Sequence, residues 1–472
     1  MRYCNPASVP QTAFDGARLL RRAVGIAVTA ACTVCIGANQ AVAQGIDIIR
    51  DTEIEHVLHS YEDPILKVAG LDPATVKIYV VNDPSINAFA AQSPAESESE
   101  DIFINAGLIL QLKSPNQVTG VLAHETGHIA GGHILRGEDA MKKAMVPMLI
   151  GMIAGIAAAI AGGGEAGMGV MALGEQAAMA NYLEFSRAQE ATADQMGQKF
   201  LLATHQSGRG MLEVFERFAQ EDAMSAYYQH SFASDHPADR ERIDLLQREV
   251  DASPYRDVPD SPAAVHEFHM IQAKLSGYLS KPDTVLGHYP PSDTSEEARY
   301  ARAMAYFRKP DLPKALSEIN SLIKDEPRDP YFWEVLGQIY VDMSQPEKGV
   351  EPYQKSVDLM PNAPLLRIAL AAAQLATEKP ALAKPALDNL KAALLEEHDN
   401  EFAWYEAAQA YSDLGNEPMA NLSTAELDFS VGNFGAAEHF AGLAQHRLAA
   451  GSPDWQRASD ILSIAQGERR RR

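Results

Sequence analysis

The chain has 472 residues, of which 46% are hydrophobic, and its formal net charge is −23 at pH 7. This length is enough for two or three domains that each bury a core. The acidic balance excludes nucleic acid as an expected partner, because binding to phosphates needs clustered Lys and Arg. It also disfavours adsorption to anionic lipid, although a peripheral or specific membrane contact stays open.

Residues 1–43 have the pattern of a secretory signal peptide. Arginines precede an apolar stretch at 23–36, and Ala-Val-Ala at 41–43 fits a cleavage site. A retained anchor helix is the alternative, but the stretch is short and is diluted by Thr, Cys and Gly. We therefore expect an exported protein.

All three cysteines, Cys4, Cys32 and Cys35, precede the predicted cleavage site. The exported protein would then have no disulfide, and its stability must come from packing. A lipoprotein cut before Cys32 is a second alternative, disfavoured by Thr29 where a larger aliphatic residue is expected. Removal of residues 1–43 takes away four arginines and one aspartate, which leaves a formal charge of −26.

The segment VLAHETGHIAGGH at 121–133 contains the zinc-peptidase pattern HExxH. On a helix, His124 and His128 share one face and can both bind one zinc ion, and Glu125 lies beside them as a general base. The apolar residues just before the motif favour a buried helix over one with two solvated histidines. The pattern therefore predicts a hydrolytic metal centre.

His133 follows the second histidine of the motif by five residues, whereas the metzincin pattern needs six. We expect it to pack or to form a hydrogen bond rather than to bind the metal. Gly131 and Gly132 are expected to permit close helix contacts.

The run AMVPMLIGMIAGIAAAIAGG at 144–163 is long and apolar enough to be compared with a membrane span. A single crossing conflicts with the chemistry, because metal-binding residues lie on both sides of it. Residues 164–180 contain two glutamates and make a poor second span. We predict a helical hairpin over 144–180, with a turn at 162–164, over or beside the active site. Whether it is core or an adaptable apolar surface is open.

A tetrahedral catalytic zinc needs a third protein ligand. Glu190 and Asp194 are four residues apart in the helix-patterned run SRAQEATADQMGQKFLL, so they share a face. We expect Glu190 to bind the metal and Asp194 to accept the N–H of a metal-binding histidine. Alone, the two acids would be interpreted as solvated charges; the upstream motif favours the metal site.

An HExxH motif followed by ExxxD resembles the zinc peptidases that include the CAAX prenyl proteases and the bacterial heat-shock protease X. His124, Glu125 and His128 match the first motif, and Glu190 and Asp194 match the second. The resemblance implies a zincin-type domain with a small β-sheet, one Zn²⁺ per chain, and hydrolysis of peptide bonds.

Two further segments are similar to this family. Asn87, Ala88 and Phe89 match its substrate-binding edge strand, although SPAESESED replaces the short glycine turn that usually follows. His236 and Arg242, in SDHPADRERI, match its late histidine-proline and arginine pattern. We expect His236 or Arg242 to stabilise the oxyanion; the alternative, to which the resemblance points, is that His236 is an inhibitory zinc ligand.

The composition changes at about residue 253, where an acidic, proline-rich linker leads into the first helices of the segment 253–290. Tetratricopeptide repeats are predicted over 291–466. The residues that fit the repeat are Tyr306, Ala315, Pro327, Trp333, Leu336, Gly337, Tyr340, Gly349, Tyr353, Pro361, Trp404 and Tyr411, with a last helix pair from Asn433. Such a solenoid presents a concave surface to a partner. The basic residues 467–472 are expected to be a solvated tail.

The sequence thus predicts an α+β, mostly α fold, with a metallopeptidase domain over 44–252 followed by an α-solenoid. We expect an exported zinc endopeptidase that acts on misfolded or stalled envelope proteins, and whose repeats bind substrates or partners. By resemblance, it belongs to the part of the family that serves outer-membrane β-barrel assembly in the periplasm of Gram-negative bacteria. The alternative is a chaperone or adaptor with a latent or silent protease domain.

Overall fold

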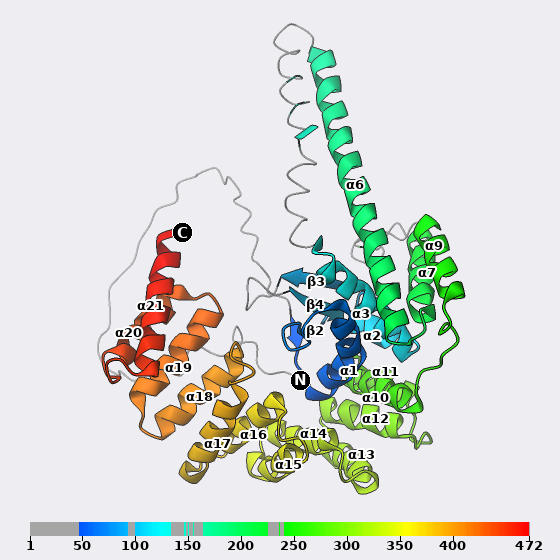
Figure 1. Cartoon of the computed structure of the whole chain (residues 1–472). Helices are drawn as coiled ribbons and strands as arrows, with labels where there is room; N and C mark the ends of the chain where they lie inside the picture. Colours follow the sequence, from blue (N-terminus) through cyan, green and yellow to red (C-terminus); the bar gives the residue numbers. More distant parts are fainter. Residues whose placement is uncertain are drawn as a thin grey trace, which may run out of the picture.

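The computed structural model describes residues 47–92, 100–133, 164–224, 236 and 240–471, together with 146, 147, 150 and 154. The predicted signal peptide, and most of the first arm of the predicted hairpin with its turn, lie outside these residues. Figure 1 shows a body of helices around a small sheet, from which helix α6 projects, and an arc of helices that curves beneath the body.

The sheet has four strands in the order β1-β2-β4-β3. Their bounds are β1 Ile48–Ile49, β2 Ile78–Val81, β3 Ala88–Gln92 and β4 Glu100–Asn105. β4 pairs parallel with β2 and antiparallel with β3, and β1 pairs antiparallel with β2. β4 is buried along its whole length, whereas β3 is the last strand in the order and hence an edge of the described sheet.

The helices of the body surround α3, which carries the HExxH motif. Their bounds are α1 Thr52–Ala69, α2 Ala106–Gln111, α3 Pro115–Ala130, α6 Gly164–Ala203, α7 Arg209–Met224 and α9 Arg240–Ala252. The side chain of Ser114 caps α3 by accepting the Gln117 N–H, and Pro115 occupies the first turn, where no N–H is needed. α3 is buried from Gln117 to His128, as the apolar residues before the motif predict.

Close contact between α3 and α6 depends on Gly127, inside the HExxH motif. A Cβ atom added at Gly127 would lie 2.6 Å from the carbonyl oxygen of Ala193 on α6. Any larger residue would therefore push the two helices apart. The approach places the two predicted metal motifs side by side.

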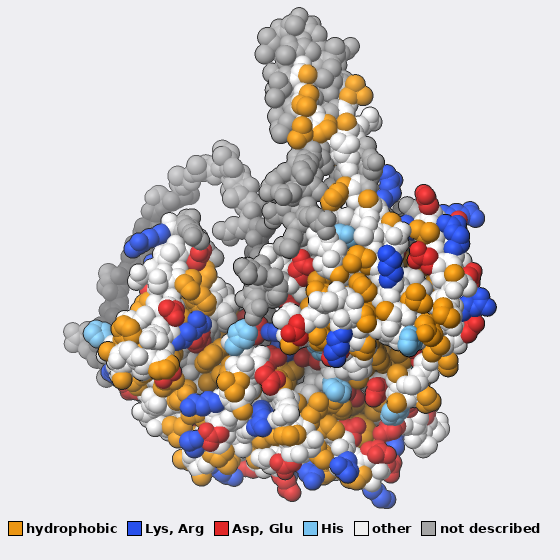
Figure 2. Space-filling view, viewed as in Figure 1, with side chains coloured by type: hydrophobic (Ala, Val, Ile, Leu, Met, Phe, Trp, Pro, Cys, Tyr) orange, Lys and Arg blue, Asp and Glu red, His pale blue; other side chains and the backbone are white. Residues whose placement is uncertain are grey.

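α6 joins two segments that the sequence suggests as separate units. One unbroken helix of 40 residues contains both the predicted second arm, 164–180, and the run with Glu190 and Asp194. Its upper part projects from the body (Figures 1 and 2). Leu173 and Met179 of α6 are 66% and 57% exposed. Among the described residues, no helix is long and apolar enough to cross a membrane. The hairpin itself stays a prediction.

The arc in Figure 1 is built from antiparallel helix pairs. Its helices are α10 Pro262–Leu279, α11 Pro282–His288, α12 Glu296–Arg308, α13 Leu312–Asp325, α14 Pro330–Asp342, α15 Pro346–Leu359, α16 Pro364–Ala376, α17 Pro380–Ala393, α18 Glu401–Asp413, α19 Glu417–Ser430, α20 Phe434–Gln445 and α21 Pro453–Arg471.

Three equivalent positions in the arc make the same hydrogen bond, which confirms the predicted repeats. The Trp333 indole N–H donates to the carbonyl six residues earlier, and Trp404 does the same. In the repeat between them, the Arg367 guanidinium donates to the carbonyl of Pro361, again six residues earlier. Each bond ties the first helix of a pair to the turn that precedes it. The mostly helical α+β fold class is also confirmed.

α10 joins the arc to the body, so the segment predicted as linker and first helices is a packed joint. Phe268, Ile271 and Leu275 are part of the core of the body. Met270, on another face of the same helix, is part of the first core of the arc. The two parts therefore share a helix that is buried on both sides.

Lys274 is the charged centre of this joint and is buried. Its ammonium group lies 2.7 Å from Asp51 and 3.1 Å from Glu53, both at the start of α1, and 3.4 Å from Glu334 on α14. The Tyr300 hydroxyl on α12 also donates to Glu53. A second contact forms further along the arc, where Arg50 makes two hydrogen bonds to Glu397.

The described part of the predicted solvated tail, 467–471, is the end of a helix, and Arg469 and Arg470 are exposed. α21 continues to Arg471, and Arg469 forms an ion pair with Glu438 on α20. Cations near a helix C-terminus are favoured by the helix dipole.

We expect Lys274→Met to destabilise the joint by about 3–5 kcal/mol, because it leaves three buried carboxylates without their cation. Urea unfolding monitored by intrinsic fluorescence measures the loss. Lys384→Met, at an exposed ion pair on α17, should leave the midpoint unchanged.

The loss of unfolding free energy that Lys274→Met causes, relative to wild type, should be smaller at pH 6 than at pH 8. Burial raises the pKa of Glu53 to about 7, even though Lys274 acts to lower it. An acid whose pKa is raised by folding binds its proton more tightly in the folded state, so acidification offsets the missing cation. A loss that is independent of pH would contradict this account of the joint.

Candidate metal centre

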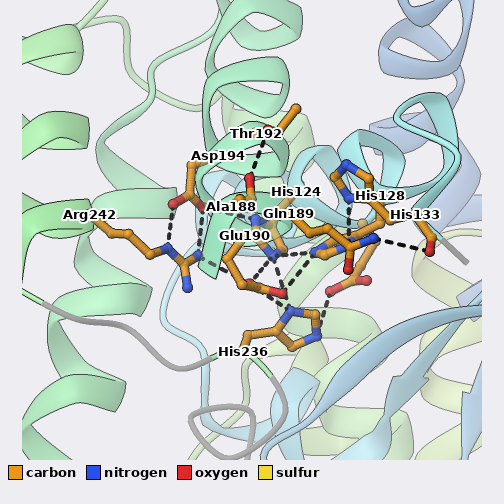
Figure 3. Close-up of polar contacts among 11 residues, drawn as sticks. His124, His128, His133, Ala188, Gln189, Glu190, Thr192, Asp194, His236 and Arg242 are labelled. Atoms are coloured by element: carbon orange, nitrogen blue, oxygen red, sulfur yellow. Dashed lines mark hydrogen bonds and ion pairs between the residues drawn. The ribbon is translucent and has the colours of Figure 1, made fainter. Parts of the chain in front are cut away.

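Four buried side chains converge where α3 and α6 cross. They are His124, His128, Glu190 and His236, and their donor atoms all lie within 4.8 Å of one another. Figure 3 shows the two α3 histidines facing Glu190 on α6, with His236 approaching from the other side. The structure thus brings together all three predicted metal ligands.

The distances among the three predicted ligands fit a tetrahedral zinc site. Nε2 of His128 lies 3.1 Å from Nε2 of His124, and each of these atoms lies 3.4 Å from an oxygen of Glu190. Ligand atoms about 2.0–2.1 Å from one zinc ion are separated by roughly 3.4 Å at tetrahedral angles. Two imidazole nitrogens that face each other with lone pairs repel, and a shared cation removes the repulsion. The residues therefore fit a metal ion.

Asp194 and Arg242 hold the ligands from behind. Asp194 Oδ1 lies 3.0 Å from Nδ1 of His124, as predicted for a carboxylate that fixes the tautomer of a ligand. Arg242 on α9 forms two hydrogen bonds with Asp194, of 2.7 and 2.9 Å, and also lies 3.2 Å from Glu190. Because Arg242 already pairs with two acids, the geometry favours a positioning role for it over the expected contact with an oxyanion.

The pKa values of the acids follow from these contacts. Burial acts to raise the pKa of Glu190, but the neighbouring His236 and His124 outweigh it and hold that pKa below its ordinary value. Burial opposes ionisation of Asp194 as well, yet hydrogen bonds from His124 and Arg242 lower its pKa. Both acids are therefore available as anions, the form that binds a cation or orients an imidazole.

Glu125 is fully buried beside the cluster and is not one of the four donors. Burial raises its pKa above the ordinary value for a glutamate. Nε2 of His236 lies 3.6 Å from Oε1 of Glu125, and the backbone of Ala90 on β3 acts to lower the pKa of Glu125 without cancelling the effect of burial. A buried carboxylate with a raised pKa beside the predicted metal ligands is suited to taking up a proton.

The predicted substrate segment lies at the edge of the sheet. Ala88 and Phe89 begin β3, and the Asn87 carbonyl accepts the Asn105 N–H just before that strand. Phe89 stacks on Phe103 of β4 with ring centroids 5.1 Å apart. The segment SPAESESED that departs from the family pattern lies mostly outside the described residues, although its last two acids belong to β4.

Glu62 on α1 belongs to none of the predicted motifs, yet it contacts one of them. It is fully buried and accepts a hydrogen bond from Thr126 of the HExxH motif. Burial raises the pKa of Glu62 to about 8. The sequence feature that could have indicated this contact is the position of Glu62 on the apolar face of an amphipathic helix. An acid at such a position is rarely buried without a partner.

Comparison with known proteins agrees with this geometry. Residues 50–250 match the model of peptidase family M48. This segment is a peptidase M48 domain. The predicted resemblance is thereby confirmed, and the HExxH and ExxxD motifs lie inside the matched range.

Three curated relatives show how much of the chain is shared. The beta-barrel assembly-enhancing protease of Escherichia coli K12 is 19% identical over 86% of this chain and 81% of its own length. A Vibrio cholerae relative with a corresponding name is 22% identical over 62% of this chain and 60% of its own. Metalloprotease LoiP of Escherichia coli K12 is 31% identical over 38% of this chain and 64% of its own. The chain thus spans less than two thirds of the length of the last two relatives.

We expect Glu190→Ala to weaken zinc binding more than about 100-fold, since loss of a ligand costs more than loss of a residue that only orients one. Equilibrium dialysis followed by elemental analysis measures the metal content. Glu175→Ala, at an exposed acid on the same helix, is the matched control. Stoichiometric zinc in Glu190→Ala after mild chelation would rule Glu190 out as a ligand.

Proposed function

We propose that the chain is an exported zinc endopeptidase that cleaves polypeptides, with one zinc ion bound by His124, His128 and Glu190. The observation that carries the proposal is the convergence of these three buried donors beside Glu125. Three protein ligands leave a fourth position for the reaction, as catalytic zinc sites require.

Each residue at the centre has a chemical task in this proposal. When bound, zinc polarises the scissile carbonyl and acidifies a water molecule. Glu125 takes the proton from that water and passes it to the leaving amine. Asp194 holds the ring of His124, and Arg242 holds Asp194 and Glu190 in place. The buried surroundings strengthen these charge interactions.

β3 is the proposed substrate strand. An edge strand offers unpaired backbone groups to an extended peptide, which can add to the sheet as a further strand. β3 pairs with β4 on one side. The backbone of Ala90 on β3 forms a hydrogen bond that acts to lower the pKa of Glu125, so this strand lies next to the general base. A peptide added to β3 would therefore pass close to the general base. Such recognition is tolerant of sequence, which suits misfolded substrates.

The proposed setting is the periplasm, with outer-membrane β-barrel proteins and their assembly machinery as substrates or partners. The signal-peptide pattern of residues 1–43 supports export, and the names of two relatives refer to β-barrel assembly. The arc of repeats is the proposed partner-binding surface, because stacked helix pairs form extended concave faces.

We expect Glu125→Gln to lower the hydrolysis of an unfolded substrate such as casein by at least about 100-fold, because the general base is lost while the ligands remain. Zinc content should stay at the wild-type level, as measured on the same sample. Glu241→Gln, at an exposed acid on α9, should keep full activity. Near wild-type hydrolysis in Glu125→Gln would refute the assignment.

A latent enzyme is the second candidate, and the position of His236 favours it. Nδ1 of His236 lies 3.2 Å from Nε2 of His124 and 3.1 Å from Glu190. From there the imidazole could take the fourth zinc position and exclude water. The chain would then act as a chaperone or adaptor until that position opens.

We expect His236→Ala to raise the cleavage of casein and of the enzyme itself. If the His236-bound state makes up about 90% of the molecules, its loss raises the rate about tenfold. His269→Ala, at an exposed histidine on α10, is the control. A lower rate with zinc retained would instead establish His236 as a residue that assists the reaction.

A further inference from the structure

His133 is buried beside the metal centre without being one of its four donors. Its Nδ1 lies 3.1 Å from Nδ1 of His128, and the two rings meet edge-on with centroids 5.0 Å apart. Two ring nitrogens at this distance form a hydrogen bond only when one of them carries the proton. The contact therefore selects a tautomer for each ring.

The ligand geometry decides which ring donates. Nε2 of His128 faces Nε2 of His124 and an oxygen of Glu190, so in a metal site this atom must present its lone pair. The proton of a neutral His128 is then on Nδ1 and is donated to Nδ1 of His133. His133 must in turn carry its own proton on Nε2.

We propose that His133 is a positioning residue that holds His128 in its metal-binding tautomer and orientation. The proposal rests on the proposed zinc site. Asp194 makes the corresponding contact with Nδ1 of His124, at 3.0 Å. The two histidine ligands thus have unlike supports, a carboxylate for one and a neutral imidazole for the other.

A tight turn after α3 brings His133 back to this position. Gly132 has a φ of +61°, a left-handed conformation that costs glycine little. A Cβ atom at Gly131 would lie 2.6 Å from Nε2 of His133, so the imidazole occupies the space where a side chain would be. The spacing of five residues after His128 is therefore functional: it places His133 against the back of His128 and not at the metal.

The turn is also tied to the helix that supplies the third ligand. The side-chain amide of Gln189 on α6 donates to the His133 carbonyl at 3.3 Å. Glu190 is the next residue of that helix. His133 therefore contacts one ligand through its ring and is linked through its backbone to the helix turn that carries another.

Two isosteric substitutions test the proposal. His133→Asn places an amide oxygen where Nδ1 was, so it keeps an acceptor for His128, whereas His133→Leu has the same shape and no acceptor. We expect His133→Leu to weaken zinc binding about 10–100-fold, the usual cost of losing such a support. His133→Asn should stay close to wild type. Competition with a chromophoric chelator gives the affinities, and the visible spectrum of the Co²⁺-loaded proteins reports the ligand geometry.

The outcomes separate the two proposals. Equal zinc affinities and equal Co²⁺ spectra for the Asn and Leu variants would overturn the role of His133 while leaving the zinc site intact. A wild-type protein that binds no zinc would overturn the proposed function, and this inference with it. If His133→Leu does not fold, His133→Ala gives the answer, because it removes the acceptor without introducing a larger side chain. Unchanged zinc affinity in that variant would also overturn the proposal.

Discussion

The metal centre depends on how closely α3 and α6 can approach each other. Each helix has a glycine at the crossing: Gly127 faces the backbone of Ala193, and a Cβ at Gly197 would lie 3.0 Å from the carbonyl of Ala123. The absence of both side chains lets the predicted ligands from two distant motifs meet at one point. Zinc tolerates only small departures from its ligand distances, so helix separation and metal binding are directly linked.

The chemistry at this crossing requires more than the two motif helices. Glu190 and Asp194 are two buried acids close together, and burial disfavours their charged forms. Arg242 on α9 contacts both acids and supplies the compensating charge. A buried cluster of this kind is stable only when every member is paired, because an unpaired charge in a low-dielectric site is costly. The third helix is therefore part of the centre.

The joint at α10 relates the body to the arc of repeats. Its apolar residues belong to both cores, and Lys274 binds acids from both sides of the joint. A second contact joins Arg50 to Glu397, in the turn between α17 and α18. The arc is thus attached to the M48 domain by a shared buried helix and by ion pairs, and not by a linker alone.

The sequence by itself determined the elements whose chemistry is local. HExxH and ExxxD specify helix faces through the 3.6-residue period, so residue type and spacing alone predicted that His124, His128 and Glu190 would converge and that Asp194 would contact a histidine. The repeats could also be predicted from the sequence, because each repeat packs on its neighbour in the same way. Only the tertiary structure decided which residues contact each other across the fold. It pairs Arg242 with Asp194 and Glu190, and it places Glu62 where it accepts a hydrogen bond from Thr126. It also buries Lys274 between the body and the arc and packs His133 against His128. Such contacts depend on how elements pack, and the identity of one residue does not specify the partner that packing brings to it.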